Sequence, residues 1–139
     1  MMKLIYKVWL EKSGVRSFGE GPYRLLKGVE LTGSLREAAA RIGMAYSKAR
    51  RVITGCERSL GFALTLRKIG GASGGSSEVT VKGTELMREY EALRDEIENA
   101  IGEAYKKHFG HSIQVQLYGM ITYKRNRKKE PKDGLKINL

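Results

Sequence analysis

A stripe of apolar residues late in the chain limits the fold more than any other feature. Between residues 86 and 104 the apolar positions recur in steps of four, three, four, four and three, close to a heptad repeat. This pattern predicts a helix from about Val81 to Lys107, capped by Thr80, with a length of about 40 Å. Because that is longer than a small module can cover, we expect a homodimer rather than a stripe that packs only on its own domain. The expected dimer interface consists of Leu86, Tyr90, Leu93, Ile97 and Ile101.

The chain has 139 residues, the usual size of one domain, and a formal net charge of +11. Such an excess of positive charge favours polyanionic partners such as nucleic acid or anionic lipid. The first ten residues lack a signal-peptide cleavage site, and no other segment is apolar enough to span a membrane. The single cysteine, Cys56, fits a reducing compartment. We therefore expect a soluble, cytoplasmic, nucleoid-associated protein with no membrane contact.

Charge is distributed unevenly along the chain. Residues 24–68 hold ten Lys or Arg against three acidic residues, residues 78–103 hold three against eight, and residues 106–139 hold nine against two. This order indicates a module that faces a polyanion, a solvated or self-associating helix, and a basic tail. The run Lys124–Lys129 has no apolar pattern, so it either contacts phosphates or is merely solvated.

The first third of the chain predicts a strand pair followed by a helix. Residues 4–10 are rich in β-formers and roughly alternate, and residues 15–18 can return as a short partner strand after a turn at Gly14. Pro22 suits the first turn of a helix that reaches about Leu31. Near the end of the chain, residues 113–117 and 135–139 alternate in the same way as strands do.

Two short helices joined by a glycine follow. Ser34 and Glu37 have the spacing of a capping box, in which the Ser34 hydroxyl accepts from the Glu37 amide and Glu37 reaches back. The first helix runs from Leu35 to Ile42 and ends at Gly43. The second begins near Ala45 and ends at Gly61. These proportions are typical of a helix-turn-helix, although spacing alone also allows an unrelated helical hairpin with a solvated basic face.

The second of these helices is expected to be the recognition helix. It turns Ala49, Val52, Ile53 and Cys56 inward, which leaves basic and hydroxyl side chains outward, suited to base edges and phosphates. Residues 62–67, a Gly/Ser-rich loop at 70–77 and a partner strand at 78–80 would form a wing. The candidate DNA-binding residues are Ser34, Tyr46, Ser47, Lys48, Arg50, Arg51, Thr54, Lys68 and Ser73.

These segments resemble a known family. The runs 33–39, 43–49, 60–61, 70–75 and 80–83 look like the DNA-binding domain of the molybdate-dependent, ModE-type transcriptional regulators, and more distantly like the LysR-type N-terminal domain. The resemblance covers about residues 20–105 and implies a winged helix-turn-helix in its stand-alone short form. Ala45 stands where the family usually has Ser, and Arg50 where it often has Trp. The 139 residues leave no room for the family's oxyanion-binding domains, so we expect no molybdate binding by this chain.

Other chemistries find less support in the sequence. The glycine-rich stretch lacks the Gly-Lys-Ser/Thr ending of a nucleotide-binding loop. His108 and His111 lie at a fraying helix end without a cysteine nearby, so we expect no metal site. Cys56 is expected to be a small buried residue rather than a redox sensor. The sequence places no nucleophile beside a base, so we expect no enzymatic activity and no cofactor.

The expected fold is mainly α-helical with a small β-wing: a winged helix-turn-helix at 1–82, a linker and dimerisation helix at 83–107, and a basic extension with a possible strand at 108–139. The expected function is a homodimeric, sequence-specific transcriptional regulator that binds double-stranded DNA. Its recognition helix, at about 45–60, would lie in the major groove. The alternatives are a nonspecific architectural protein associated with DNA or RNA, and an oxyanion-binding interaction module.

Overall fold

We describe a computed structural model in which residues 2–68 and 76–119 are placed. The chain divides into two compact units, which we describe separately: one is Trp9–Arg88, and the other combines Met1–Val8 with Glu89–Leu139. The expected strand at 135–139, the basic run at 124–129 and candidate Ser73 lie outside the described residues.

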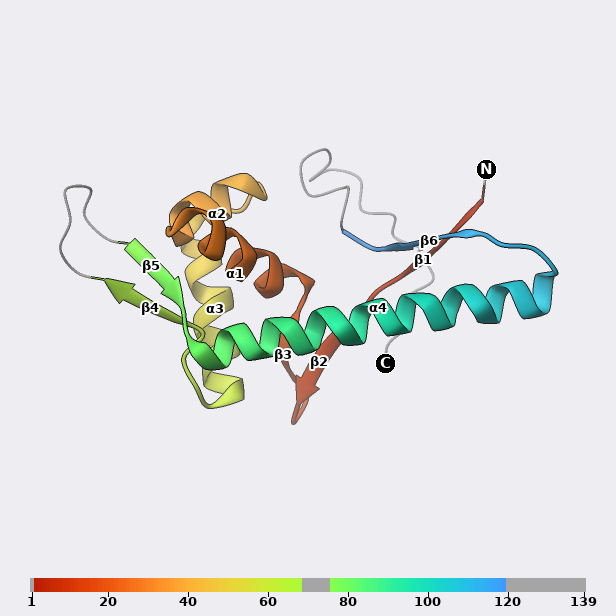
Figure 1. Cartoon of the computed structure of the whole chain (residues 1–139). Coiled ribbons are helices and arrows are strands. Elements are labelled where there is room, and N and C mark those ends of the chain that lie inside the picture. The colour runs from red at the N-terminus through yellow and green to blue at the C-terminus, as the bar shows by residue number, and fades with distance from the viewer. Residues whose placement is uncertain (1, 69–75, 120–139) are drawn as a thin grey trace. The chain divides into compact units, whose positions relative to one another are not determined.

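The unit Trp9–Arg88 contains the predicted helix pair and ribbon (Figure 1). Its helices are α1 (Glu20–Thr32), α2 (Leu35–Arg41) and α3 (Tyr46–Leu60), and α4 (Val81–Phe109) begins in it. Two antiparallel strand pairs accompany them: β2 (Trp9–Lys12) with β3 (Val15–Gly19), and β4 (Thr65–Lys68) with β5 (Ser76–Val79). This mixture of helices with small sheets confirms the predicted helix-turn-helix segment followed by a two-stranded ribbon.

The start of α2 follows the predicted cap in part. The Ser34 hydroxyl accepts a hydrogen bond from the Glu37 amide at 3.1 Å, as expected. The Ser34 amide, however, donates to the Thr32 hydroxyl at 3.2 Å, so the second bond assigned to the Glu37 side chain is made by Thr32 instead. Thr32 is only two residues away and already lies beside the turn, which gives it the shorter reach.

The turn between α2 and α3 forms where the sequence predicts it. Gly43 adopts φ 69°, a left-handed conformation that side chains with a Cβ rarely take. The Met44 amide then donates to the Ala39 carbonyl at 2.9 Å, and the Met44 side chain is buried. These bonds satisfy the end of α2 and set the direction in which α3 leaves.

Helices α1 and α2 approach each other closely at one point. A Cβ built on Gly28 of α1 would lie 2.5 Å from the Cβ of Ala38 in α2, far inside normal contact. Around this crossing the fully buried side chains include Leu25, Leu26 and Val29 of α1. Each such side chain contributes about 1.5–3 kcal/mol by leaving water. The buried face of α3 belongs to the same core, so the packing of α1 against α2 also holds α3 in place.

Two predicted strands have different bounds in the structure. The segment predicted as one strand over 4–10 is two: β1 (Lys3–Tyr6) pairs with β6 (Gln114–Leu117), and β2 pairs with β3. The change of partner breaks the ladder at residues 7–8. The strand predicted over 62–67 begins only at Thr65, because the Glu57 carboxylate accepts from the Leu64 amide at 2.6 Å and from the Thr65 amide at 3.4 Å.

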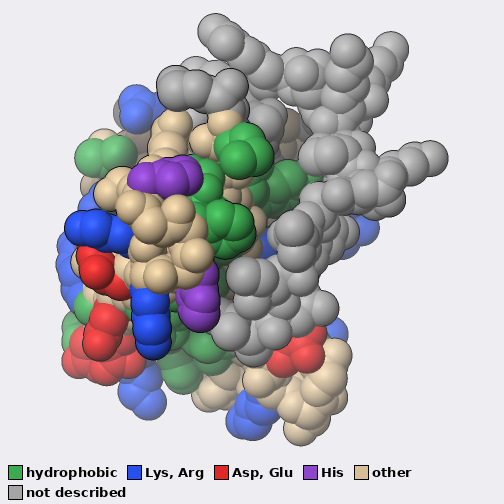
Figure 2. Space-filling model, turned by 90° about the vertical axis from the view of Figure 1, so that its right-hand side faces the viewer, with side chains coloured by type: hydrophobic (Ala, Val, Ile, Leu, Met, Phe, Trp, Pro, Cys, Tyr) green, Lys and Arg blue, Asp and Glu red, His purple; other side chains and the backbone are tan. Residues whose placement is uncertain are grey.

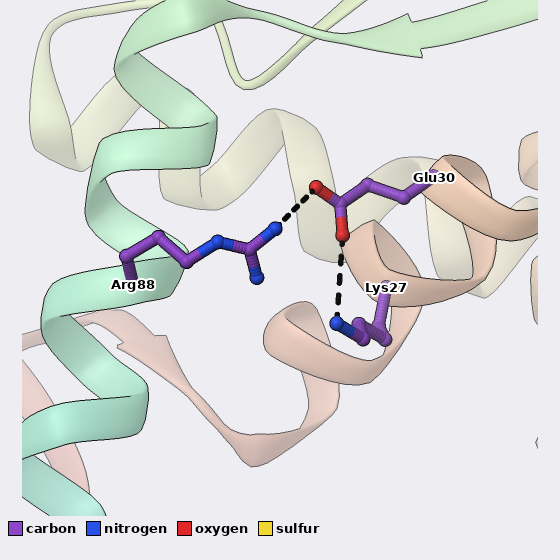
Figure 3. A network of polar contacts seen from close by, with 3 residues as sticks. All are labelled: Lys27, Glu30 and Arg88. Carbon is purple, nitrogen blue, oxygen red and sulfur yellow. Dashed lines mark hydrogen bonds and ion pairs between the residues drawn. The ribbon is translucent and has the colours of Figure 1, made fainter.

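The predicted long helix is α4, and its start is fixed as expected. The Thr80 hydroxyl accepts from the Gly83 amide at 2.9 Å and donates to the Ala63 carbonyl at 2.7 Å, so it caps the helix and joins it to the loop between α3 and β4. Two turns further on, Arg88 contacts Glu30 of α1 at 3.2 Å, and Glu30 also contacts Lys27 at 3.7 Å (Figure 3). This network is half-exposed, so each pair contributes at most about 1 kcal/mol.

In the other unit, β1 and β6 form a parallel pair, from Lys3 opposite Gln114 to Tyr6 opposite Leu117 (Figure 1). The predicted strand at 113–117 is thus confirmed. The Tyr6 hydroxyl donates to the Glu98 carboxylate of α4 at 3.3 Å, and Tyr105 stacks on Phe109 with ring centroids 4.5 Å apart. Within the described residues, no helix is both long and apolar enough to cross a membrane.

Candidate nucleic-acid interface

One face of α3 carries the side chains predicted to contact DNA. Ala49, Ile53 and Cys56 are buried against the unit Trp9–Arg88, whereas Val52, predicted to be inward, is only half-buried. The opposite face is open. Its exposed residues are Ser47, Lys48, Arg50, Arg51, Thr54 and Arg58, of which Arg58 is not among the predicted contacts, and Tyr46 at the start of the helix is half-buried.

Tyr46 is the point at which three arginines from three elements meet. The guanidinium of Arg36, from α2, lies 4.1 Å from the centroid of the Tyr46 ring, and that of Arg50, from α3, lies at 5.9 Å. Arg67, from β4, donates from Nη2 to the Tyr46 hydroxyl at 3.3 Å. A cation over an aromatic face at an exposed site contributes about 0.5–1 kcal/mol. We call Tyr46, Arg36, Arg50 and Arg67 the Tyr46 cluster.

Two members of this cluster were missed by the sequence reasoning. In the sequence, Arg36 falls between the capping-box residues Ser34 and Glu37, and Arg67 falls in the predicted wing strand, so neither position by itself predicts a DNA contact. Both are exposed, and both converge on Tyr46 from outside α3. No periodicity in the sequence predicts that these two arginines approach Tyr46. The one signal that the sequence offers is the high density of arginine between residues 36 and 67.

The Tyr46 cluster borders a shallow hollow of about 200 Å³. Glu57 lines it, and its carboxylate is already engaged by the Leu64 and Thr65 amides. The hollow is lined by Leu35, Tyr46, Arg50, Ile53, Thr54, Glu57, Thr65, Arg67 and Ser77, which come from α2, α3 and both strands of the ribbon. The surface therefore spans the helix pair and the wing.

Two other candidate residues have partners within the chain. Lys68 of β4 forms an ion pair with Glu78 of β5 at 3.0 Å, across the ribbon. The Ser34 hydroxyl oxygen accepts from the Glu37 amide, so its first role is to cap α2. Neither residue belongs to α3, since Ser34 caps α2 and Lys68 ends β4.

Cys56 lies on the buried side of α3. Its side chain is 5% exposed, and burial together with the neighbouring Glu57 charge raises the pKa of the thiol from 9.0 to about 11. A thiol with such a pKa is almost fully protonated at neutral pH, and the thiolate is the reactive form. This placement agrees with the expectation of a small buried residue.

The apolar stripe of α4 is covered unevenly. Tyr90 is buried, at 1% exposed, whereas Leu93 is 40% exposed. Leu86, Ile97 and Ile101 are each half-buried. Figure 2 shows the side of the molecule that faces right in Figure 1, where basic, acidic and hydrophobic side chains are intermixed. The exposed face of α3, by contrast, carries basic and hydroxyl side chains.

Together, α2, the turn at Gly43, α3 and the β4–β5 ribbon have the order and connections of a helix-turn-helix with a wing. No protein-family model matches the chain, and no curated protein matches it. The ModE-type resemblance therefore has no support from these comparisons.

Among solved structures, the chain is similar to the crystal structure of ArgP from Mycobacterium tuberculosis. The identity is 17% and the TM-score 0.47, and the match covers 70% of this chain but 42% of ArgP. ArgP is a LysR-type regulator, the more distant of the two families that the sequence resembles. At this identity and TM-score the likeness does not carry a function over to this chain.

Proposed function

We propose that the protein is a DNA-binding transcriptional regulator whose α3 helix lies in the major groove. The observation that carries the proposal is the exposed face of α3, on which Lys48, Arg50 and Arg51 stand with two hydroxyl side chains and without an exposed acidic residue. A helix of this kind, following a short helix and a glycine turn, reads base edges from its first turns. Arginine suits guanine O6 and N7, and hydroxyls suit phosphates or bases.

The protein acts as a homodimer in this proposal. The stripe on α4 supports it, since Leu93 is 40% exposed and Leu86, Ile97 and Ile101 are half-buried in the single chain, whereas Tyr90, at 1% exposed, is already covered and is left out of the proposed interface. A second copy would cover Leu86, Leu93, Ile97 and Ile101 by coiled-coil packing. Two α3 helices would then read two half-sites, which multiplies affinity and sets their spacing. We also propose that the protein is not an enzyme and works in the cytoplasm, on the nucleoid.

The test is a comparison of specific and nonspecific duplexes as salt is raised. Duplexes are first selected from a randomised library with the full 139-residue chain, and the selected sequence is then compared with a scrambled duplex of equal length. A regulator retains a difference of about 10³-fold or more between the two at physiological salt. If selection yields no preferred sequence, and binding to all duplexes is lost to the same extent as salt rises, the chain is a nonspecific nucleic-acid binder.

A further inference from the structure

We propose that Arg36 and Arg67 bind two DNA backbone phosphates that flank the bases read by α3, and that Tyr46 positions both arginines. This inference rests on the proposed DNA-binding function and assigns the contacts within that surface. Tyr46 is here a positioning residue, and the two arginines are the phosphate-binding residues.

The geometry of the Tyr46 cluster supports this division. The Arg36 guanidinium lies over the Tyr46 ring, with its central carbon 4.1 Å from the ring centroid, so its side chain is restrained although it is exposed. Arg67 spends one N–H on the Tyr46 hydroxyl at 3.3 Å, which leaves four further donors. Both guanidiniums are therefore oriented before a ligand arrives, and less side-chain entropy is lost on binding.

The element that carries each arginine decides what it can reach. In a helix-turn-helix the second helix enters the groove, while the first helix crosses the backbone. Arg36 belongs to the first helix, α2, and Arg67 to the ribbon beyond α3. Arg50 belongs to α3 itself, one turn after Tyr46. The first two arginines thus lie toward the backbone, and Arg50 lies toward the bases.

The positive charge of the Tyr46 cluster favours an anionic ligand. Three guanidiniums gathered around one ring repel one another, and phosphates bound by Arg36 and Arg67 offset that repulsion. Glu57, the acidic residue in the lining of the hollow, carries one negative charge, and its Oε2 accepts from the Leu64 and Thr65 amides, so it does not balance the charge of three guanidiniums. Guanidinium also matches phosphate with two parallel hydrogen bonds.

The experiment measures the affinity for a random-sequence 24-base-pair duplex by fluorescence anisotropy from about 50 to 300 mM salt, a range in which phosphate contacts govern nonspecific binding. The variants are Arg36→Ala, Arg67→Ala, Tyr46→Phe and Tyr46→Leu. The matched control is Arg16→Ala, which removes an exposed arginine stacked at 4.2 Å on Trp9 in another ribbon of the same unit. Far-UV circular dichroism and thermal melting confirm that each variant folds.

Arg36→Ala and Arg67→Ala are each expected to raise Kd about five- to tenfold at 0.1 M salt and to reduce the salt slope by about 0.9, the loss of one phosphate contact. Tyr46→Leu leaves the net charge unchanged, yet it should reduce the slope toward the combined reduction of Arg36→Ala and Arg67→Ala. Tyr46→Phe keeps the ring beneath Arg36 and loses only the hydroxyl bound by Arg67, so it should resemble Arg67→Ala or be milder.

Three results would contradict this picture in distinguishable ways. If Arg36→Ala and Arg67→Ala match Arg16→Ala in affinity and slope, the phosphate assignment is wrong although the chain binds DNA. If Tyr46→Leu keeps the wild-type slope, Tyr46 does not position the arginines. If the wild-type chain shows no salt-dependent binding to any duplex, the proposed DNA-binding function fails, and this inference fails with it.

Discussion

Gly28 and Ala38 are packed so closely that a Cβ on Gly28 would stand 2.5 Å from the Cβ of Ala38. The next nearest atom is the backbone Cα of Ala38, at 2.9 Å, so no flexible side chain could move aside. The crossing of α1 over α2 therefore requires a residue without a Cβ at position 28. Since α2 precedes the turn that sets α3, this contact also bears on the position of the recognition surface.

We expect Gly28→Ala to destabilise the protein by about 1–3 kcal/mol, the usual effect of overpacking a tight core. Chemical denaturation followed by circular dichroism measures the change. Gly55→Ala in α3 is the matched control, because nothing lies within 4 Å of a Cβ built there. That variant should stabilise the helix by up to about 1 kcal/mol. Equal effects of the two substitutions would show that the crossing is not tight in solution.

Arg50→Ala or Arg51→Ala should weaken binding to the selected duplex by about 1–3 kcal/mol if that arginine makes a bidentate base contact. The same variant should lose its preference at one base position only. Binding to a panel of single-base variants of the selected duplex measures both effects. Arg16→Ala, far from α3 in sequence, should leave the preference intact. A uniform loss on every duplex would instead assign Arg50 and Arg51 to phosphates.

Replacing Leu93 and Ile97 together with Asp should give monomers, because two charges would be buried in the proposed seam. These monomers should bind the selected duplex far more weakly, since two half-sites are no longer read together. Sedimentation equilibrium measures the assembly state. Replacing the exposed Asp95 and Glu96 of the same helix with Ala is the control and should leave the dimer intact. A double Asp variant that remains dimeric would place the contact elsewhere.

Cys56 makes stability depend on alkaline pH. Its pKa is raised from 9.0 to about 11 by burial, with a smaller effect from Glu57. Between these two values the unfolded chain has lost the thiol proton while the folded chain retains it, so the free energy of unfolding falls as pH rises from about 9 to about 11. Denaturation of the wild type and of Cys56→Ala across this range isolates the effect, because other titrating groups are common to both. A constant difference between the two would contradict the shift.

Most features that the sequence predicted correctly depend only on residues close together in the chain. The cap at Ser34, the left-handed turn at Gly43 and the cap at Thr80 each need only a few neighbouring residues, and all three form. The strand predicted over residues 4–10 was wrong because its ends depend on which segment supplies hydrogen bonds. That information lies far along the chain, at β6 and β3.

The candidate site was predicted only where one helix carries it. The outward face of α3 follows from the 3.6-residue period, so Ser47, Lys48 and Arg50 were found. Arg36 and Arg67 reach Tyr46 from α2 and β4, and the second of these contacts joins residues 21 positions apart. Such convergence depends on how the elements cross, which the small residues at Gly28 and Ala38 govern and no sequence period records.

The pairing of β1 with β6 also has a consequence for the order of folding. Lys3 donates to Gln116 across 113 residues, so almost the whole chain forms the loop that this ladder must close. Contacts of such long sequence separation form late, because the entropy of closing the loop is lost before any bond compensates for it. Trp9–Arg88, by contrast, is continuous in sequence. During translation this stretch leaves the ribosome before β6, the partner of the N-terminal strand, emerges, so the helix-turn-helix can assemble while residues 3–6 have not yet formed their ladder hydrogen bonds.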